Sequence, residues 1–163
     1  MGEGRPTRKP DSDTAHADPA HADTADAVLA AARLARLLDR ASGELGLAHY
    51  RVLALVSAGD ERASRLAERL ALGKPAVSAS IEALVARGLV TRDPVAGDQR
   101  AIRLGLTDAG RQLLAETQDA LSLRLEQVLA ATGDPGATRS ALVSLGLAID
   151  AHLEQRRAEA GKA

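Results

Sequence analysis

The side chains of this chain that could do chemistry are mainly cations and hydroxyls between residues 61 and 111. This segment carries nine arginines and lysines against six acidic residues, whereas the whole chain has a formal net charge of −1. A local basic excess favours contact with a polyanion such as nucleic acid. The stretch DPVAGDQRAIRLGLTDAG, residues 93–110, adds an Asp98-x-Arg100 pair beside a turn. An arginine at such a tip can enter a narrow minor groove, where the potential of DNA is most negative.

Other kinds of chemistry find little support in the residues. The absence of cysteine excludes disulfides, redox-active thiols and cysteine-ligated metals. The four histidines are scattered, and no nucleophile–base pair or glycine-rich phosphate loop is visible, so we expect no enzyme, no catalytic residue, no structural metal and no cofactor. The near-repeat AHADPAHADT has two interpretations, transient metal binding or a solvated low-complexity segment. Its possible ligands are His16, Asp18, His21 and Asp23.

The elements that must position the basic residues begin after a polar segment. Residues 1–24 cannot bury enough apolar surface to offset their ordering entropy, so we interpret them as a disordered tail. A helical pattern runs from about residue 25 to residue 44, and Gly43 and Gly46 mark its end. A second helix follows in AHYRVLALVSAG, residues 48–59, and stops at Gly59.

The next stretch predicts a helix-turn-helix. In ASRLAERLALGKPAVSASIEALVARGLV, residues 63–90, Ser64 can cap a short helix and LGK forms a tight turn. Pro75 fits the first position of a new helix, where its missing N–H costs nothing, and Gly88 is a natural stop. Two short helices joined by a glycine-bearing turn form this motif.

A hairpin and two helices complete the chain. LVTR, residues 89–92, and AIRLGL, residues 101–106, predict two antiparallel strands around a loop that contains Pro94 and Gly97. Thr107 then caps a long helix that runs to about residue 131, and a last helix covers about 137–159. The expected fold is mainly α with a small β-hairpin wing. No apolar run reaches the roughly 18–20 residues of a membrane span, and the cytoplasm is the default compartment.

This order of elements resembles the MarR (multiple-antibiotic-resistance regulator) family of winged helix-turn-helix transcription factors. RLAERLALGKPAVSASIEALVARGLVTRDPVAGDQRAIRLGLTDAGRQLL, residues 65–114, carries the resemblance. Within it, Asp98-x-Arg100, a short strand and LTDAG match the D-x-R and Leu-Thr-x-x-Gly of the family. The family match implies a winged lobe at 48–106 and intertwined dimerisation helices at 25–47 and 107–160.

The resemblance also implies a function. Such proteins are homodimers that bind pseudo-palindromic operators in double-stranded DNA, usually as repressors. Many release DNA when a small, often aromatic or phenolic, molecule binds between the bundle and the lobe. His49 and Tyr50 fall at this junction and are candidate effector-binding residues, or else a surface histidine and a packed tyrosine. The chain has no other aromatic residue, so we also expect subunit association to contribute to its stability.

In the DNA-binding interpretation, the helix that starts near Pro75 presents its first side chains to base edges. Family members often carry arginine at the positions of Ala79 and Ala83, and this chain does not. We therefore expect modest direct readout, with Arg100 carrying more of the contact and Asp98 bracing the wing by pairing with Arg100 or Arg92. The alternative for these two residues is that Asp98 is a turn residue and Arg100 a solvated charge at the end of a strand. The alternative is a winged-helix protein–protein module with weakened DNA binding. The candidate DNA contacts are Arg62, Arg65, Lys74, Pro75, Ala76, Ser78, Ala79, Ser80, Arg87, Arg92, Asp98, Arg100 and Arg103.

Overall fold

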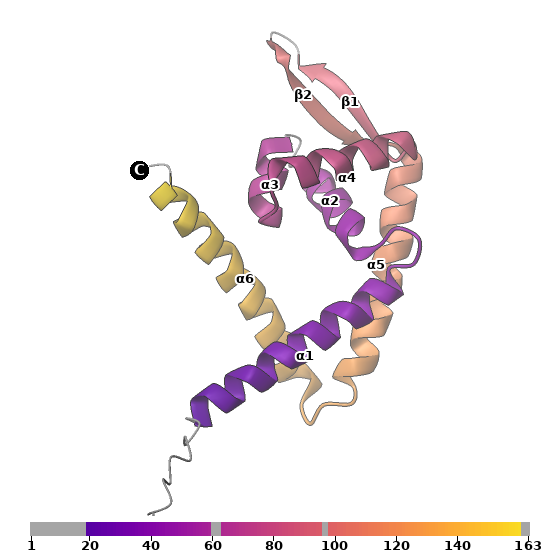
Figure 1. Cartoon of the computed structure of the whole chain (residues 1–163). Coiled ribbons are helices and arrows are strands. Elements are labelled where there is room, and N and C mark those ends of the chain that lie inside the picture. The colour runs from indigo at the N-terminus through magenta and orange to yellow at the C-terminus, as the bar shows by residue number, and fades with distance from the viewer. Residues whose placement is uncertain (1–18, 60–62, 96–97, 161–163) are drawn as a thin grey trace, which may run out of the picture. The chain divides into compact units, whose positions relative to one another are not determined.

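The computed structural model describes residues 19–59, 63–95 and 98–160. Within these ranges the chain forms six helices and a two-stranded antiparallel sheet, as the sequence predicts (Figure 1). The elements are α1 (Pro19–Ala41), α2 (Leu47–Ser57), α3 (Ala63–Leu70), α4 (Lys74–Ala86), β1 (Val90–Val95), β2 (Asp98–Leu106), α5 (Asp108–Leu129) and α6 (Pro135–Ala160). The chain divides into two compact units, residues 1–34 and residues 35–163.

Helix α1 begins six residues before the helix that the sequence predicts. Residues 19–24 are helical, so the interpretation of residues 1–24 as a disordered tail extends too far. The physical reason is local composition, because alanine is the strongest helix former and a proline is favourable at the first helical position. In the near-repeat, His16 and Asp18 lie outside the described residues, whereas His21 and Asp23 fall on α1.

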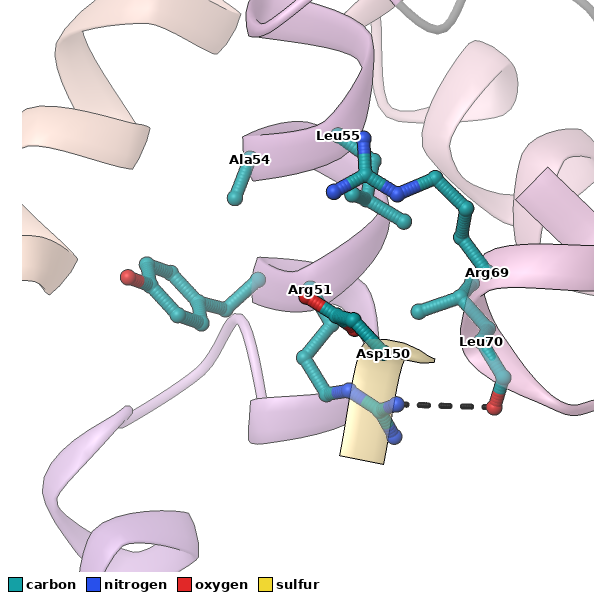
Figure 2. Close-up of a pocket in the computed structure, with 7 residues that line it drawn as sticks. Arg51, Ala54, Leu55, Arg69, Leu70 and Asp150 are labelled. Atoms are coloured by element: carbon teal, nitrogen blue, oxygen red, sulfur yellow. Dashed lines mark hydrogen bonds between the residues drawn. The ribbon is translucent and has the colours of Figure 1, made fainter. Parts of the chain in front are cut away.

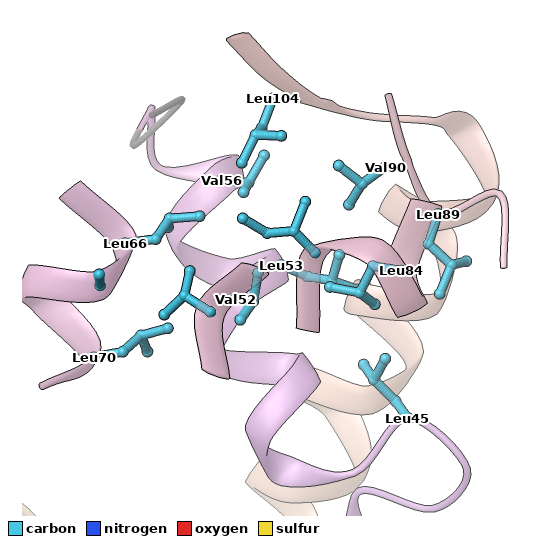
Figure 3. Packing of buried hydrophobic residues seen from close by; sticks show 13 residues of the cluster. Leu45, Val52, Leu53, Val56, Leu66, Leu70, Leu84, Leu89, Val90 and Leu104 are labelled. Carbon is cyan, nitrogen blue, oxygen red and sulfur yellow. The ribbon is translucent and has the colours of Figure 1, made fainter. Parts of the chain in front are cut away.

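The core of the second unit lies between α2, α3, α4 and the hairpin (Figure 3). Leu53, Leu66 and Leu84, one from each of the three helices, are completely buried. Each contributes about 1.5–3 kcal/mol by removing a leucine side chain from water. The full buried cluster is Leu45, Val52, Leu53, Val56, Leu66, Ala67, Leu70, Val77, Ile81, Leu84, Leu89, Val90 and Leu104. This core contains only aliphatic side chains, with Tyr50 packed at its edge.

The turn between α3 and α4 differs from the prediction in its details. Helix α3 begins at Ala63, so Ser64 lies inside its first turn and is not its cap. Ala71 has a φ of 53°, in the left-handed region, while Gly73 is extended with a φ of −62° and forms the N-cap of α4. The left-handed residue after a helix is usually glycine, since any Cβ is strained there. Alanine therefore occupies the strained position of this turn.

The end of α4 follows the prediction closely. Gly88 has a φ of 69°, a conformation that glycine adopts without steric cost. Its N–H donates to the carbonyl of Val85 at 2.9 Å, and the N–H of Leu89 donates to the carbonyl of Leu84 at 3.0 Å. This pair of bonds is the Schellman arrangement, which satisfies helix-terminal carbonyls and reverses the chain. Gly88 thus directs the chain from α4 into the hairpin.

Thr107 joins the hairpin, α4 and α5. Its hydroxyl accepts a hydrogen bond from the N–H of Gly110 at 3.0 Å, which confirms the predicted N-cap, and donates to the carbonyl of Gly88 at 2.7 Å. Its own N–H donates to the carbonyl of Leu89 at 3.2 Å. A Cβ at Gly110 would lie 2.1 Å from that same carbonyl oxygen. The threonine and glycine of LTDAG are therefore both required by one close backbone approach.

The hairpin is longer than the two strands that the sequence predicts. Strand β1 extends through Asp93 and Pro94, which were expected in the loop, and β2 already begins at Asp98. Leu104 pairs with Arg92 and Arg103 pairs with Asp93, and the register shifts between residues 94 and 95. A proline is tolerated in this two-stranded sheet because edge strands leave one row of N–H groups unpaired.

Helices α5 and α6 carry apolar side chains that the chain itself leaves uncovered. Leu123 on α5 is 63 % exposed, and Val143 and Leu147 on α6 are 60 % and 66 % exposed. Helix α5 ends at Leu129, two residues before its predicted end, and α6 starts at Pro135, two residues before its predicted start. None of the helices in the described ranges has the length and apolarity that a membrane crossing requires.

Candidate nucleic-acid interface

One face of α4 is buried and the opposite face is open to solvent. Val77, Ile81 and Leu84 point into the core with at most 2 % exposure. The first turns of the open face present a cation, small side chains and a hydroxyl: Lys74, Pro75, Ala76, Ser78 and Ala79 are all exposed. A helix exposed in this way can enter the major groove of DNA, and the N–H groups of its first turn suit a phosphate.

The two serines of α4 are not equivalent. Ser78 is exposed, whereas Ser80 is half-buried and its hydroxyl donates to the carbonyl of Ala76 at 3.0 Å. This bond within the helix uses the only hydroxyl proton of Ser80. Ser78 therefore keeps both its donor and its acceptor capacity for a ligand, and Ser80 keeps only an acceptor.

The hairpin lies beside α4 and forms a shallow groove with it. A cavity of about 210 Å³ is lined by Ser78 and Ile81 from α4 and by Arg92, Ile102 and Leu104 from the hairpin. Arg92 is exposed, and Ile102 is 51 % exposed although it belongs to the apolar face of β2. Arg103 is also exposed and lies opposite Asp93 in the strand register. The helix and the hairpin therefore share one surface, to which Arg92 contributes a cation, whereas Arg103 lies on the other face of the two strands.

The side chains of three predicted site residues lie outside the described part of the chain. Arg62 lies outside the described residues. Asp98 and Arg100 lie at the start of β2, and Asp98 is the strand partner of Val95. Their side chains lie outside the described part of the chain. The pairing of Asp98 with Arg100 or with Arg92 therefore stays a prediction.

Two further cations among the predicted DNA contacts, Arg65 and Arg87, do not lie at the first turn of α4. Arg65 is exposed in the first turn of α3. Arg87 lies at the opposite end of α4 from Lys74, a separation of about 20 Å along the helix axis. Its guanidinium donates to the carbonyl of Glu44 at 3.5 Å. The structure therefore does not bring Arg87 together with the first turn of α4.

A second cavity, of about 220 Å³, lies where α2, α3 and α6 meet (Figure 2). Its lining residues are Tyr50, Arg51, Ala54, Leu55, Arg69, Leu70 and Asp150. The guanidinium of Arg51 donates to the carbonyl of Leu70 at 3.4 Å. Of these residues only Tyr50 is predicted from the sequence, and Arg69, Leu70 and Asp150 are distant from it in the chain and meet it only in the fold.

The two predicted effector residues have different surroundings. His49 is half-buried but does not line this cavity, and its Nδ1 donates to the carbonyl of Leu45 at 3.1 Å. The hydroxyl of Tyr50 donates to the side-chain oxygen of Gln118 on α5. Burial raises the pKa of Tyr50 above its ordinary value of about 10, because desolvation disfavours the phenolate. Tyr50 thus connects the cavity to α5.

Helix α3, the turn, α4 and the hairpin together define a winged helix-turn-helix protein. A protein-family model described as MarR family matches residues 44–101, which include these elements. Solved structures agree with this match. The transcriptional repressor CouR, bound to a 23-mer DNA duplex, is 28 % identical with a TM-score of 0.65, and the alignment covers 80 % of this chain and 90 % of CouR.

Two other regulators have the same fold. The transcriptional regulator MOSR of M. tuberculosis, in complex with DNA, is 28 % identical with a TM-score of 0.59, over 78 % of this chain and 96 % of MOSR. Wild-type MarR from E. coli is 21 % identical with a TM-score of 0.63, over 74 % of this chain and 93 % of MarR. Residues 44–101 therefore match the MarR family, and the fold of the chain is that of DNA-binding MarR-family transcriptional regulators. MarR-family regulators are not enzymes, in agreement with the prediction from the sequence.

Proposed function

We propose that this chain is a homodimeric repressor that binds a pseudo-palindromic operator through α4 and the hairpin of each protomer. The observation that carries the proposal is the groove that Ser78 of α4 and Arg92 of the hairpin line together. CouR, a repressor bound to DNA, supports the direction of regulation. In this arrangement Lys74 and the first N–H groups of α4 contact a phosphate, and Ser78 reaches base edges.

The homodimer is supported by the exposed apolar surface of α6. Leu145 and Ile149, one helical turn apart, are 54 % and 50 % exposed, and Val143 and Leu147 form a second exposed pair. A helix that is apolar on more than one side is stable in water only when other elements cover it. A second copy of the chain provides such a cover and also supplies the second lobe that a palindromic operator requires.

A small effector fits the cavity between α2, α3 and α6. Two arginines and a tyrosine lie on its wall with one carboxylate, so the cavity suits a small aromatic molecule that carries an anionic or phenolic group. Because Tyr50 also contacts Gln118 on α5, a ligand that displaces the tyrosine would change the contact between the lobe and the long helix. Such a ligand would release DNA if it binds the arrangement with Tyr50 displaced more tightly than the arrangement in which Tyr50 contacts Gln118.

The proposed function is tested by fluorescence anisotropy with a labelled duplex from the region upstream of the chain's own gene. If the dimer neutralises roughly 6–10 phosphates, the logarithm of affinity falls with the logarithm of salt concentration with a slope of about −0.9 per contact. Arg100→Ala weakens binding by at least about 1 kcal/mol, since it removes the arginine at the hairpin tip. Glu154→Gln on α6 is the control for the purity and concentration of active protein.

Affinity that does not depend on salt would contradict this proposal. A chain that binds no duplex, but captures another protein through the same lobe, would instead support the interaction-module alternative. That alternative is motivated by the absence of arginine on the open face of α4, where alanines stand at residues 76, 79, 83 and 86.

A further inference from the structure

Helix α4 has few charged residues, and they lie far apart along its axis. Among the thirteen residues of this helix only Lys74 and Glu82 carry a charge. Lys74 stands at the first position, where a cation faces phosphate. Glu82 lies eight residues further along, about 12 Å down the axis, and is exposed. A carboxylate is unexpected on a helix that faces DNA, because phosphate repels it.

Glu82 belongs to the row of α4 that lies opposite the buried one. Pro75, Ala79, Glu82 and Ala86 follow the i, i+4, i+7, i+11 spacing, which places them on one face of a helix. That face is turned away from the core, where Val77 and Ile81 are buried. Glu82 is therefore on the most outward face of α4.

The neighbours of Glu82 are small. Residues 79, 83 and 86 around it are alanines, and Ser78 precedes it by one turn. Short side chains would let the helix backbone approach a groove closely, and the long side chain of Glu82 extends beyond these neighbours. No described residue forms a hydrogen bond or an ion pair with its carboxylate. The positions one turn before and after it on α4 hold Ser78 and Ala86, neither of which is a cation.

We infer that Glu82 is a specificity-determining residue of this protein, which accepts a hydrogen bond from the N4 amino group of a cytosine in each half-site. The inference rests on the proposed DNA binding through α4. In the major groove, cytosine presents an amino donor, whereas guanine presents two acceptors that repel a carboxylate. Adenine presents an amino group next to the acceptor N7, which makes it a poorer partner for an anion. Every sequence without the amino group leaves Glu82 unpaired among phosphates.

The test is selection of binding sequences from a randomised duplex library by the full-length protein. Wild type, Glu82→Gln and Glu82→Ala are compared, with Glu116→Gln on α5 as a control that makes the same change in net charge. Glu116 is exposed and accepts a hydrogen bond from Gln112 within its own helix. Circular dichroism melting checks that the variants fold, and direct titration then measures Kd for duplexes that differ at single symmetric positions.

Wild type is expected to select cytosine at one symmetric position in each half-site, and replacing it should raise Kd at least about fivefold. Glu82→Ala should lose this preference. Glu82→Gln should move it to adenine, because an amide can pair with both N6 and N7 of adenine. Glu116→Gln should keep the wild-type preference.

Three results would overturn the inference. The first is that both Glu82 variants select the wild-type sequence. The second is a uniform increase in affinity for every duplex with unchanged ranking, which would mean that Glu82 only repels phosphate. The third is a wild-type protein that selects no sequence at all, which would remove the proposed function together with this inference.

Discussion

At the scale of single residues, the contact between Leu89 and Gly110 explains why the motif LTDAG contains a threonine and a glycine. The carbonyl of Leu89 accepts the N–H of Thr107 and lies where a Cβ of residue 110 would stand. The hydroxyl of Thr107 caps α5 and at the same time donates to the carbonyl of Gly88. Both requirements come from one approach of α5 to the chain that leaves α4.

Gly110→Ala is expected to destabilise the fold by about 2 kcal/mol or more, because the new methyl group would overlap a backbone oxygen that cannot rotate away. The free energy of unfolding is measured by urea denaturation. Gly146→Ala is the matched control: this glycine lies within α6 and a Cβ there meets nothing within 4 Å. Equal stability of Gly110→Ala and wild type would show that α5 does not approach Leu89 this closely.

Tyr50 allows a direct test of its burial. It is the only tyrosine, and the chain has no tryptophan, so the absorbance of phenolate reports on this residue alone. The midpoint of the native titration should lie above about 10, since burial raises the pKa of Tyr50, and the midpoint in denaturant should return to about 10. Because the pKa of Tyr50 is higher in the native than in the unfolded protein, burial of the neutral tyrosine contributes fully to stability below about pH 10. This contribution is lost as the pH rises through the native pKa. Identical midpoints in the native and denatured protein would contradict the burial.

At the scale of elements, the turn between α3 and α4 contains the strained residue of the helix-turn-helix. Ala71 adopts a left-handed conformation, with the N–H of Leu72 donating to the carbonyl of Ala67 at 3.1 Å. Glycine is the residue that accepts this conformation without a steric penalty. The chain places its glycine two residues later, at the N-cap of α4, where the backbone is extended.

Ala71→Gly should therefore stabilise the protein, by about 1 kcal/mol, since removal of the Cβ relieves the left-handed strain by more than the added freedom of the unfolded chain costs. Thermal or urea unfolding measures the change. Ala86→Gly, in the last turn of α4, is the control and should destabilise, because its conformation is helical. A loss of stability in Ala71→Gly would contradict the left-handed turn.

The sequence predicted those elements whose signals are local. Thr107 predicts the N-cap of α5 and Gly88 predicts the end of α4, each from the chemistry of one residue, and both are found in these roles. Helix α1 starts earlier than predicted, because the alanines at residues 20, 22 and 25 favour a helix although the segment is otherwise polar. The turn between α3 and α4 is found where it is predicted, but its left-handed residue is Ala71 and not Gly73.

The candidate site was predictable only in part. The open face of α4 follows from its buried stripe, which the sequence displays as a helical period. The hydrogen bond from the hydroxyl of Ser80 to the carbonyl of Ala76 depends on a side-chain rotamer, which a sequence pattern does not predict. The cavity residues Arg69 and Asp150 lie about eighty residues apart in the chain and meet only through the packing of α6. Arg87 was predicted from charge alone, which does not say at which end of a helix DNA lies.

At the scale of the whole molecule, dimerisation is expected to govern stability. The buried core contains only aliphatic side chains, while Leu147 and several neighbours on α6 remain exposed in one chain. Association covers this surface, so Tm should rise with protein concentration over a hundredfold range, as mass action requires for a dimer that unfolds to monomers. Sedimentation at the same concentrations identifies the species present. A Tm that stays constant, with a monomer in sedimentation, would contradict a stabilising dimer.

Sequence-specific DNA binding by two winged lobes is tested most directly by two values of Kd at one fixed salt concentration. One is for a duplex that the protein itself selects, and the other is for a scrambled duplex of the same composition. Two protomers are expected to bind each selected duplex at least about 10³-fold more tightly than the scrambled one. Equal affinity for the two duplexes, or no binding to either, would contradict it.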